Sequence, residues 1–391
     1  MTLQKLLGTM AAAGLLGLTA LGAQAQDTIK IGLIAPFSGP FANHGEMIED
    51  GIKAYMLEHG DMVAGKKIEI IKRDTTGPLP DVAKRLAQEL VVRDKVDFLA
   101  GFGLTPEAMA VAPIAEQAKK PMIIMNAATS VISTKSKYIA RVSHTLPQLA
   151  APMGIWAPKN GIKRVVTLVA DYGPGIDAEG AFKTSFAANG GTVLESVRVP
   201  LNNPEFAPYI QRIKDAKPDA VFIFVPAGEQ AIGFMKSYRE RGLAQAGIKV
   251  IGPGDVTDDY VLPAMGNTTV GVITTFHYSV AHDSPENKNF LKQFAKANPK
   301  AGRPNFMAMA AYDGMEAIYR VSKQLNGAID GDKAMAVLKG MTINSPRGPL
   351  VIDAESRDPV QTVYVRKVEM VKGEPYNVEF DKFMAVRDPG K

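Results

Sequence analysis

The sequence predicts an α/β protein made of two doubly wound, Rossmann-like lobes that are joined by a multi-strand hinge. Apolar runs of strand length alternate with helical segments along most of the chain. This alternation begins again after Pro147, with a similar length and spacing. The chain has 391 residues, which favours two domains over one. Two sheets, each with its own helices, account for these observations.

The first run of elements starts with the apolar strand at residues 27–34, which ends at the turn Phe37-Ser38-Gly39-Pro40. Further strands are expected at residues 67–71, 96–100, 122–125 and 138–143. Helices are expected at residues 46–57 and 80–93, and a third should begin at Thr105 and end before Pro121. These elements make up most of the first lobe.

Residues 96–130 form the most informative stretch, because they read as one strand–helix–strand unit. Thr105-Pro106-Glu107 carries a hydroxyl, a proline and an acid, which together are typical of a helix start. Both strands run in the same direction, so the turns that follow them open on the same edge of the sheet. Thr105, Thr129 and Ser130 would meet there, beside free N–H groups that suit a carboxylate. The alternative is that Thr105 only caps the helix.

The second run of elements builds the second lobe. Its strands are expected at residues 164–170, 192–199, 220–225 and 249–252, and its helices at residues 177–189, 206–216 and 230–241.

The last third of the chain contains more helices than strands. We expect a strand at residues 270–276, helices at 287–297, 307–324 and 333–339, and a terminal hairpin at 362–371 and 378–383. These helices lack enough strands for a third lobe, so they should complete the first one. The predicted division is residues 26–146 and 277–350 for the first lobe, and residues 147–276 and 351–391 for the second.

Residues 1–25 have the features of a secretory signal peptide. Lys5 precedes an apolar run, and Ala23-Gln24-Ala25 matches a cleavage site, so we expect an exported protein that is cleaved near Ala25. The rest of the sequence has no long uncharged apolar stretch and no cysteine. The formal net charge of +5 is mild and spread out, which argues against a nucleic-acid partner.

No pattern of catalytic or metal-binding residues stands out. The motifs of P-loops, zinc hydrolases, calcium loops and serine hydrolases are absent, and Gly101-Phe102-Gly103 lacks the last glycine of a dinucleotide fingerprint. The five histidines lack metal-ligand spacing and are interpreted as surface or loop residues. Asp258-Asp259 is interpreted as a solvated helix start, whereas Trp156 and three methionines (Met307, Met309 and Met315) are assigned to the core. We therefore expect no cofactor, no metal and no catalytic residue.

Several segments resemble the periplasmic solute-binding proteins of ABC importers, and most closely the group that binds branched-chain amino acids (Leu/Ile/Val). The segments that carry the resemblance are IGLIAPFSGPFANHG, GFGLTPEAMAVAPIAEQAKKPMI, NAATS, VADYGPG, VIGPGD and AYDG, in this order and at this spacing. The resemblance implies a type I two-lobed fold with a ligand site between the lobes.

The resemblance also implies candidate site residues. Thr105 and Thr129 would supply hydroxyls, Ala127 would supply its backbone to a ligand carboxylate, His44 would occupy the first loop, and Tyr172 would close from the second lobe. Phe41 and Phe102 lie beside these loops and could flank a ring, with core packing as the alternative. The candidate set is completed by Gly228, Gly254, Asp255 and His277.

One position departs from the amino-acid binders. Gly254 stands where those proteins carry an acid for the ligand ammonium, and Asp255 follows one residue later. An unpaired buried ammonium is costly, so we expect a carboxylate without an α-ammonium, with an aromatic or phenyl-keto acid favoured. Branched-chain amino acids, short amides and urea are the alternatives within the family.

The prediction for function is a periplasmic receptor, expected as a monomer, that closes on its ligand and delivers it to an ABC permease in the inner membrane. A secreted enzyme and a sensor on the same scaffold are the alternatives from other classes.

Overall fold

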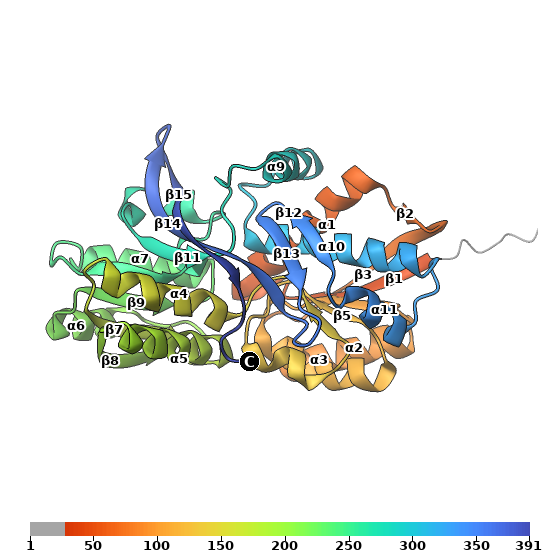
Figure 1. Cartoon of the computed structure of the whole chain (residues 1–391), viewed down its shortest axis with the longest axis horizontal. Helices are drawn as coiled ribbons and strands as arrows, with labels where there is room; N and C mark the ends of the chain where they lie inside the picture. Colours follow the sequence, from red (N-terminus) through yellow and green to blue (C-terminus); the bar gives the residue numbers. More distant parts are fainter. Residues whose placement is uncertain (1–27) are drawn as a thin grey trace, which may run out of the picture.

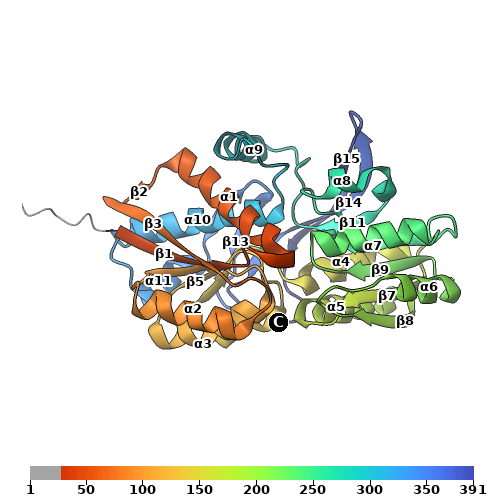
Figure 2. The same cartoon turned by 180° about the vertical axis from the view of Figure 1, so that it is seen from behind.

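The computed structural model describes residues 28–391 and consists of two α/β lobes that lie side by side (Figure 1). The view from behind shows the same two bodies, with the C-terminus between them (Figure 2). The predicted fold class is therefore confirmed. The predicted signal peptide lies outside the described residues.

The first lobe is built on a six-stranded sheet of order β2-β3-β1-β4-β5-β6. Its strands are β1 (Thr28–Ala35), β2 (Met62–Val63), β3 (Lys66–Asp74), β4 (Phe98–Gly101), β5 (Met122–Ile124) and β6 (Ile139–Arg141). All pairs are parallel except β2 with β3. The order reverses direction at β1, which is the mark of a doubly wound sheet.

Helices cover both faces of this sheet. They are α1 (Ala42–His59), α2 (Pro80–Val92) and α3 (Thr105–Ala118), with the short 3₁₀ helices η1 (Gly39–Phe41) and η2 (Ser130–Lys135). Ile29, Ile31 and Leu33 of β1 join the core on the side of α1. Ile34 and Leu99 face the opposite core, below α2 and α3. Apolar residues on both faces of the strands explain why the predicted runs were nearly continuous.

The second lobe repeats this topology in the order β8-β7-β9-β10-β11 and then adds β14 and β15. Its strands are β7 (Arg164–Ala170), β8 (Thr192–Val199), β9 (Ala220–Phe224), β10 (Lys249–Pro253), β11 (Ile273–Phe276), β14 (Pro359–Val371) and β15 (Glu374–Val386). Its helices are α4 (Leu146–Lys159), α5 (Gly173–Ala188), α6 (Ala207–Ala216), α7 (Glu229–Glu240) and α8 (Leu262–Met265), with η3 (Gly254–Thr257) and η4 (Gly266–Thr269). The β14–β15 hairpin projects from this lobe in Figure 1.

The remaining helices return to the first lobe. They are α9 (Pro285–Ala297), α10 (Phe306–Gln324) and α11 (Gly331–Leu338), and their buried residues share one core with β1 and α1. The contact between α1 and α10 is so close that a Cβ on Gly51 would lie 2.0 Å from the carbonyl oxygen of Ala308. Only glycine allows this approach.

Within residues 28–391, the chain crosses between the lobes at three places: from β6 to α4, from β11 to α9, and from β13 to β14. The strands β12 (Thr342–Ser345) and β13 (Gly348–Ile352) pack on the first lobe's core but are hydrogen-bonded to β14, where Val351 pairs with Val360. These crossings form the hinge. We therefore propose that residues 28–146 and 277–350 form the first lobe and that residues 147–276 and 351–391 form the second, as predicted for the same boundaries.

Three local predictions were wrong. Helix α4 was missed because Pro152 and Pro158 interrupt its sequence, yet it forms with Pro147 in its first turn and Thr145 as its N-cap. The strands β12 and β13 were also missed, in a stretch that reads as Pro- and Gly-rich turns. Thr105 is the first residue of α3 and not its cap, a position that Leu104 occupies.

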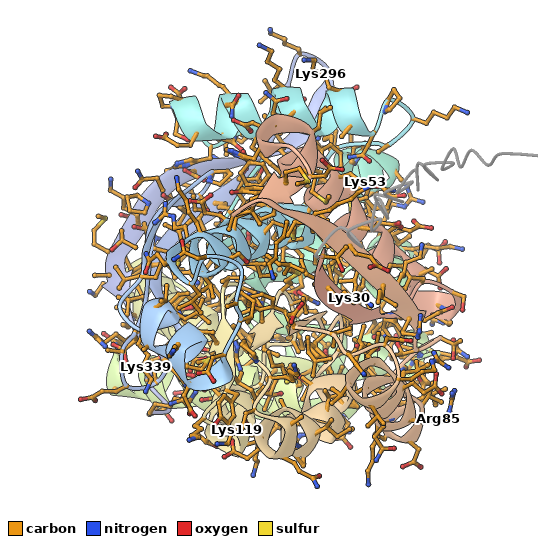
Figure 3. All side chains as sticks on the ribbon, turned by 90° about the vertical axis from the view of Figure 1, so that its right-hand side faces the viewer. Lys30, Lys53, Arg85, Lys119, Lys296 and Lys339 are labelled. Carbon is orange, nitrogen blue, oxygen red and sulfur yellow. The ribbon has the colours of Figure 1, made fainter. Side chains whose placement is uncertain are left out.

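Positive charge is scattered over the surface. Figure 3 labels cationic residues that come from different elements and lie apart, among them Lys53 on α1 and Arg85 on α2. Lys53 forms ion pairs with Glu49 and Asp50, and Arg85 forms one with Glu89. Across residues 28–391, none of the helices combines the length and the apolar composition that are needed to cross a bilayer.

Candidate functional site

Two threonines on neighbouring loops form the first-lobe side of the candidate site. Thr105 begins α3, and Thr129 follows β5 and precedes η2. Their hydroxyl oxygens lie 3.0 Å apart, and both residues are buried. The positive end of the α3 dipole reaches the same point, so this corner favours an anion.

The backbone of Ala127 does not offer its N–H here. That group donates to the carbonyl oxygen of Phe102 at 2.9 Å and so extends the β4–β5 pairing. Phe102 itself is fully buried in the core below α2 and α3, with its backbone in the left-handed region at φ 65°. The core alternative therefore holds for Phe102.

His44 connects the two lobes. Its Nδ1 lies 3.3 Å from the carbonyl oxygen of Gly103 in the first lobe, and its Nε2 lies 3.2 Å from that of Ala227 in the second. Burial lowers the pKa of His44, and the two backbone contacts partly oppose this. The neutral ring carries one N–H, so it donates to only one of the two carbonyls at a time.

A cavity lies between the lobes at this point. Its walls consist of His44, Gly103, Leu104, Thr105, Asn126, Ala127, Ala128, His144, Leu146, Tyr172, Pro174, Phe224, Pro226, Ala227, Asp255 and Phe306. The cavity is narrow. The volume that is open to the centre of a water-sized sphere is about 20 Å³.

The lobes touch around this cavity, so the structure has the closed arrangement. Ser130 N donates to Asp177 Oδ2 of α5 at 2.8 Å. A Cβ on Gly173 would lie 2.5 Å from Thr129 Oγ1, and one on Gly228 would lie 2.8 Å from the Asn43 side chain. Gly228 also has φ +99°, so both its conformation and its contact favour glycine.

The second-lobe wall is aromatic. Tyr172 stands at the N-cap of α5, and its ring stacks against that of Phe224 with centroids 6.2 Å apart. Burial raises the pKa of Tyr172, and the nearby Asp255 raises it further. Phe306, at the start of α10, reaches the cavity from the first lobe. The cavity therefore offers rings on both sides.

Asp255 is the acid in the cavity wall, and it is only 6% exposed. Burial raises its pKa to about 7, against the lowering effects of its own backbone N–H and of Arg366. Its Oδ2 is buried without a hydrogen-bond partner among the described residues. The preceding position favours glycine, because a Cβ on Gly254 would lie 2.1 Å from Arg366 Nη2.

Two further histidines, His144 and His277, lie in loops, as interpreted, but they are buried together. His144 and His277 are almost fully buried, with ring centroids 4.6 Å apart. Burial lowers the pKa of both well below the usual value, and nearby charged or polar groups add to this. His144 lines the cavity, whereas His277 lies behind it. His44 is buried within α1, so the surface or loop interpretation was wrong for His44.

The interpretation of Asp258-Asp259 as a solvated helix start was also wrong. Both residues are almost fully buried, and burial raises the pKa of Asp258 to about 8. Asn305 donates to Asp258 at 3.2 Å, and Asn377 donates to Asp259 at 2.8 Å. Trp156 and the three methionines are buried, as predicted.

The structure brings five of the predicted residues into one cavity wall: His44, Thr105, Ala127, Tyr172 and Asp255. Thr129 adjoins this wall, with its hydroxyl oxygen 3.0 Å from that of Thr105, and Gly228 and Gly254 shape the neighbouring backbone. The wall residues that were not predicted include Asn126, His144, Leu146, Phe224 and Phe306. Asn126 and Phe224 lie at or just past the ends of predicted strands and could have been found by that rule. Phe306 had no such signal, because α10 returns from far along the chain.

Metal binding has no support in the described part of the chain. Among residues 28–391, no group of three or more histidine, aspartate or glutamate side chains is arranged to hold a metal ion.

Comparison with known proteins gives consistent similarities. A family model described as periplasmic binding protein matches residues 28–374. The Leu/Ile/Val-binding protein homolog 6 of Brucella melitensis is 47% identical over 365 residues, which cover 93% of this chain and 94% of that protein.

Two solved structures resemble the whole described chain. A solute binding protein of an ABC transporter from Rhodopseudomonas palustris BisB5, in complex with 3,4-dihydroxybenzoic acid, is 54% identical with a TM-score of 0.90. One from R. palustris HaA2, in complex with p-hydroxybenzoic acid, is 47% identical with a TM-score of 0.91. Each comparison covers 93% of this chain and 99% of the other.

Proposed function

The chain belongs to the periplasmic binding protein family, and from this premise we propose that it is the receptor of an ABC importer for an aromatic carboxylate of the benzoate class. The resemblance predicted from the sequence is thereby confirmed. The receptor is exported to the periplasm, acts as a monomer, and delivers its ligand to a permease in the inner membrane.

The observation that carries the proposal is the cavity between the lobes. It combines an anion-binding corner at Thr105 with the aromatic walls of Tyr172, Phe224 and Phe306. A flat ring with one carboxylate matches this combination. The relatives in complex with 3,4-dihydroxybenzoic and p-hydroxybenzoic acid support the same class of ligand.

Binding proceeds by closure of the lobes. In the open form, the first lobe offers the hydroxyls of Thr105 and Thr129 at the start of α3. The ligand carboxylate docks there, and Tyr172 and Asp255 then arrive with the second lobe. The ligand contacts both lobes only in the closed form, so it shifts the population toward that form.

A branched-chain amino acid is the second candidate. It is favoured by the 47% identical relative, which is named for Leu/Ile/Val binding, and by the presence of an acid in the cavity. The benzoate class ranks first because the 54% identical relative is in complex with a benzoate and because the cavity walls are aromatic.

A thermal-shift panel tests the proposal. The purified mature protein is heated with benzoate, 4-hydroxybenzoate, 3,4-dihydroxybenzoate, leucine, valine or urea. A ligand at about 1,000 times its Kd adds about 4 kcal/mol of stability, which is a clear shift. Stabilisation by leucine or valine, with none from the benzoates, would show that the protein is a receptor for amino acids instead.

The alternative of an enzyme is tested on the same samples. Mass spectrometry after overnight incubation should recover the stabilising compound unchanged, since a receptor returns its ligand. A new product in the sample would contradict the receptor role.

A further inference from the structure

Asp255 places a carboxylate oxygen without a partner in the wall of the cavity. The residue is 6% exposed, and its Oδ2 has no hydrogen-bond partner among the described residues. A buried acceptor that stays unpaired costs stability, so such an atom in a ligand cavity indicates a donor on the ligand.

The neighbouring guanidinium does not supply that donor. Arg366 donates to the carbonyl of Tyr278, to Thr274 Oγ1 at 3.1 Å, and to the carbonyl of Gly254 at 3.4 Å. It acts on Asp255 through its charge, at longer range. Oδ2 of Asp255 is therefore left as a carboxylate acceptor for a ligand, beside the unpaired Nδ1 of His144 in the same cavity wall.

A hydroxyl fits this acceptor better than an ammonium does. An ammonium has three donors to satisfy, and it would enter the field of the Arg366 guanidinium. A phenolic O–H brings a single proton and no charge. The aromatic wall formed by Tyr172 and Phe224 would hold the ring that carries this hydroxyl.

We propose that Asp255 accepts a hydrogen bond from a ring hydroxyl of the bound ligand and thereby selects hydroxylated benzoates over benzoate. This inference rests on the proposed function. It assigns the two ends of the ligand to different lobes, with the carboxylate at Thr105 and Thr129 and the hydroxyl at Asp255.

The preference for hydroxylated ligands should depend on pH. Burial raises the pKa of Asp255 to about 7, with Arg366 on β14 lowering it; Tyr172 on the β7–α5 turn and Asp258 on its own loop also lie within its field. Benzoate leaves Oδ2 bare, so it should bind best when Asp255 is protonated and weaken as the pH rises through 7. A hydroxylated ligand donates to the ionised form and should keep its affinity.

Titration calorimetry at about pH 6 and pH 8 tests the proposal on the full mature chain. The ligands are benzoate, 4-hydroxybenzoate and 3,4-dihydroxybenzoate. For the unaltered protein at pH 8, we expect at least one hydroxylated ligand to bind roughly 10- to 100-fold more tightly than benzoate, the scale of a hydrogen bond to a charged group. The ratio should be smaller at pH 6.

Three variants decide the role of the residue. Asp255→Leu removes the acceptor and should bring the ratio close to one, whereas Asp255→Asn should reduce the ratio and abolish its pH dependence. Asp258→Asn is the matched control, because Asp258 is a buried acid three residues further on that does not line the cavity. It should retain the preference for the hydroxylated ligands at pH 8.

The outcomes separate this inference from the proposed function. Absence of binding by every benzoate to the unaltered protein contradicts the proposed function. Benzoate binding without a preference for the hydroxylated ligands, or with a preference that survives both Asp255 substitutions, overturns the role of Asp255. If the Asp255 variants lose affinity equally for all ligands, the ratio of affinities is unchanged, and this result also overturns the role of Asp255. If the variants bind nothing measurable, the pH dependence of the ratio in the unaltered protein decides.

Discussion

The hydroxyl oxygens of Thr105 and Thr129 lie 3.0 Å apart, although 24 residues separate them in the chain. They meet because β4 and β5 are adjacent and parallel, so the loops after both strands open on the same edge of the sheet. Each hydroxyl can donate one hydrogen bond. A ligand carboxylate with two oxygens could therefore replace their mutual contact with two of its own.

Substitution of either threonine should weaken ligand binding. We expect Thr105→Val and Thr129→Val each to cost about 1.5–3 kcal/mol, since each removes a hydrogen bond to a charged group while it keeps the shape of the side chain. Calorimetry with the ligand found in the thermal-shift panel measures the loss.

The matched control for these variants is Thr134→Val. Thr134 is exposed on η2, where its hydroxyl donates to the carbonyl of Val131, so its loss should leave affinity unchanged. Full affinity in both Thr105→Val and Thr129→Val would show that the ligand carboxylate does not bind at these two threonines.

The contribution of Glu107 to the stability of the protein should fall as the pH rises. Glu107 is fully buried at the start of α3, and burial raises its pKa to about 8. The folded state therefore holds a proton that the unfolded state releases above its ordinary pKa of 4.5. Between these two values, each pH unit lowers the unfolding free energy by up to about 1.4 kcal/mol.

Glu107→Gln tests this contribution. The amide can still accept from the Leu104 N–H, which lies 3.0 Å from Glu107 Oε2, and it can donate to Thr75. We expect the Tm of this variant, relative to that of the unaltered protein, to rise between about pH 5 and pH 8. Glu69→Gln, at an exposed position of β3, should keep the original slope. A slope that does not change in Glu107→Gln would show that this carboxyl ionises freely.

The sheet topology could be predicted because apolar or alternating residues mark the parallel strands in the sequence. Strands β7 and β8 have the bounds expected from their apolar or alternating residues, and their partners differ from prediction mainly at the ends. The failures have local causes. Three prolines in α4 read as breaks, although a helix that packs tightly against α5 tolerates them, as the contact between Gly154 and Phe182 shows.

The burial of the polar groups could not be predicted, because it depends on contacts between distant segments. His277 is enclosed by Phe276, Phe306 and His144, which come from three parts of the chain. The same holds for Asp258, whose partner Asn305 belongs to the cap of α10. Strand ends could be found from local patterns, but the side chains that reach them from other elements could not.

The hinge should depend on the buried ion pair between Arg347 and Asp313. Arg347, in the β12–β13 turn, pairs with Asp313 of α10 at 2.6 Å and also donates to the carbonyl of Ser143 and to Gln361. It thus joins three of the segments that meet at the hinge. We expect Arg347→Ala to lower the unfolding free energy by about 3–5 kcal/mol, because it leaves the buried Asp313 carboxylate uncompensated. Urea denaturation without ligand measures the change.

An exposed ion pair provides the comparison. Arg85 pairs with Glu89 along α2 with a side chain that is 62% exposed, so Arg85→Ala should cost less than about 1 kcal/mol. Similar losses for the two variants would mean that the buried pair is already relaxed by solvent or by rearrangement.

Closure should also depend on His44, whose Nε2 lies 3.2 Å from the Ala227 carbonyl across the lobe boundary. His44→Phe keeps a ring that can pack against Phe41 but removes the hydrogen bond that the tautomer with the proton on Nε2 donates to Ala227, so we expect roughly 3- to 10-fold weaker ligand binding. Without ligand, the His44→Phe variant should also be more open than the unaltered protein in small-angle scattering. His59→Phe, on the exposed end of the same helix, changes the same atoms without touching the second lobe and should leave both measurements unaltered. If both variants behave alike, the contact between His44 and Ala227 follows closure and does not stabilise it.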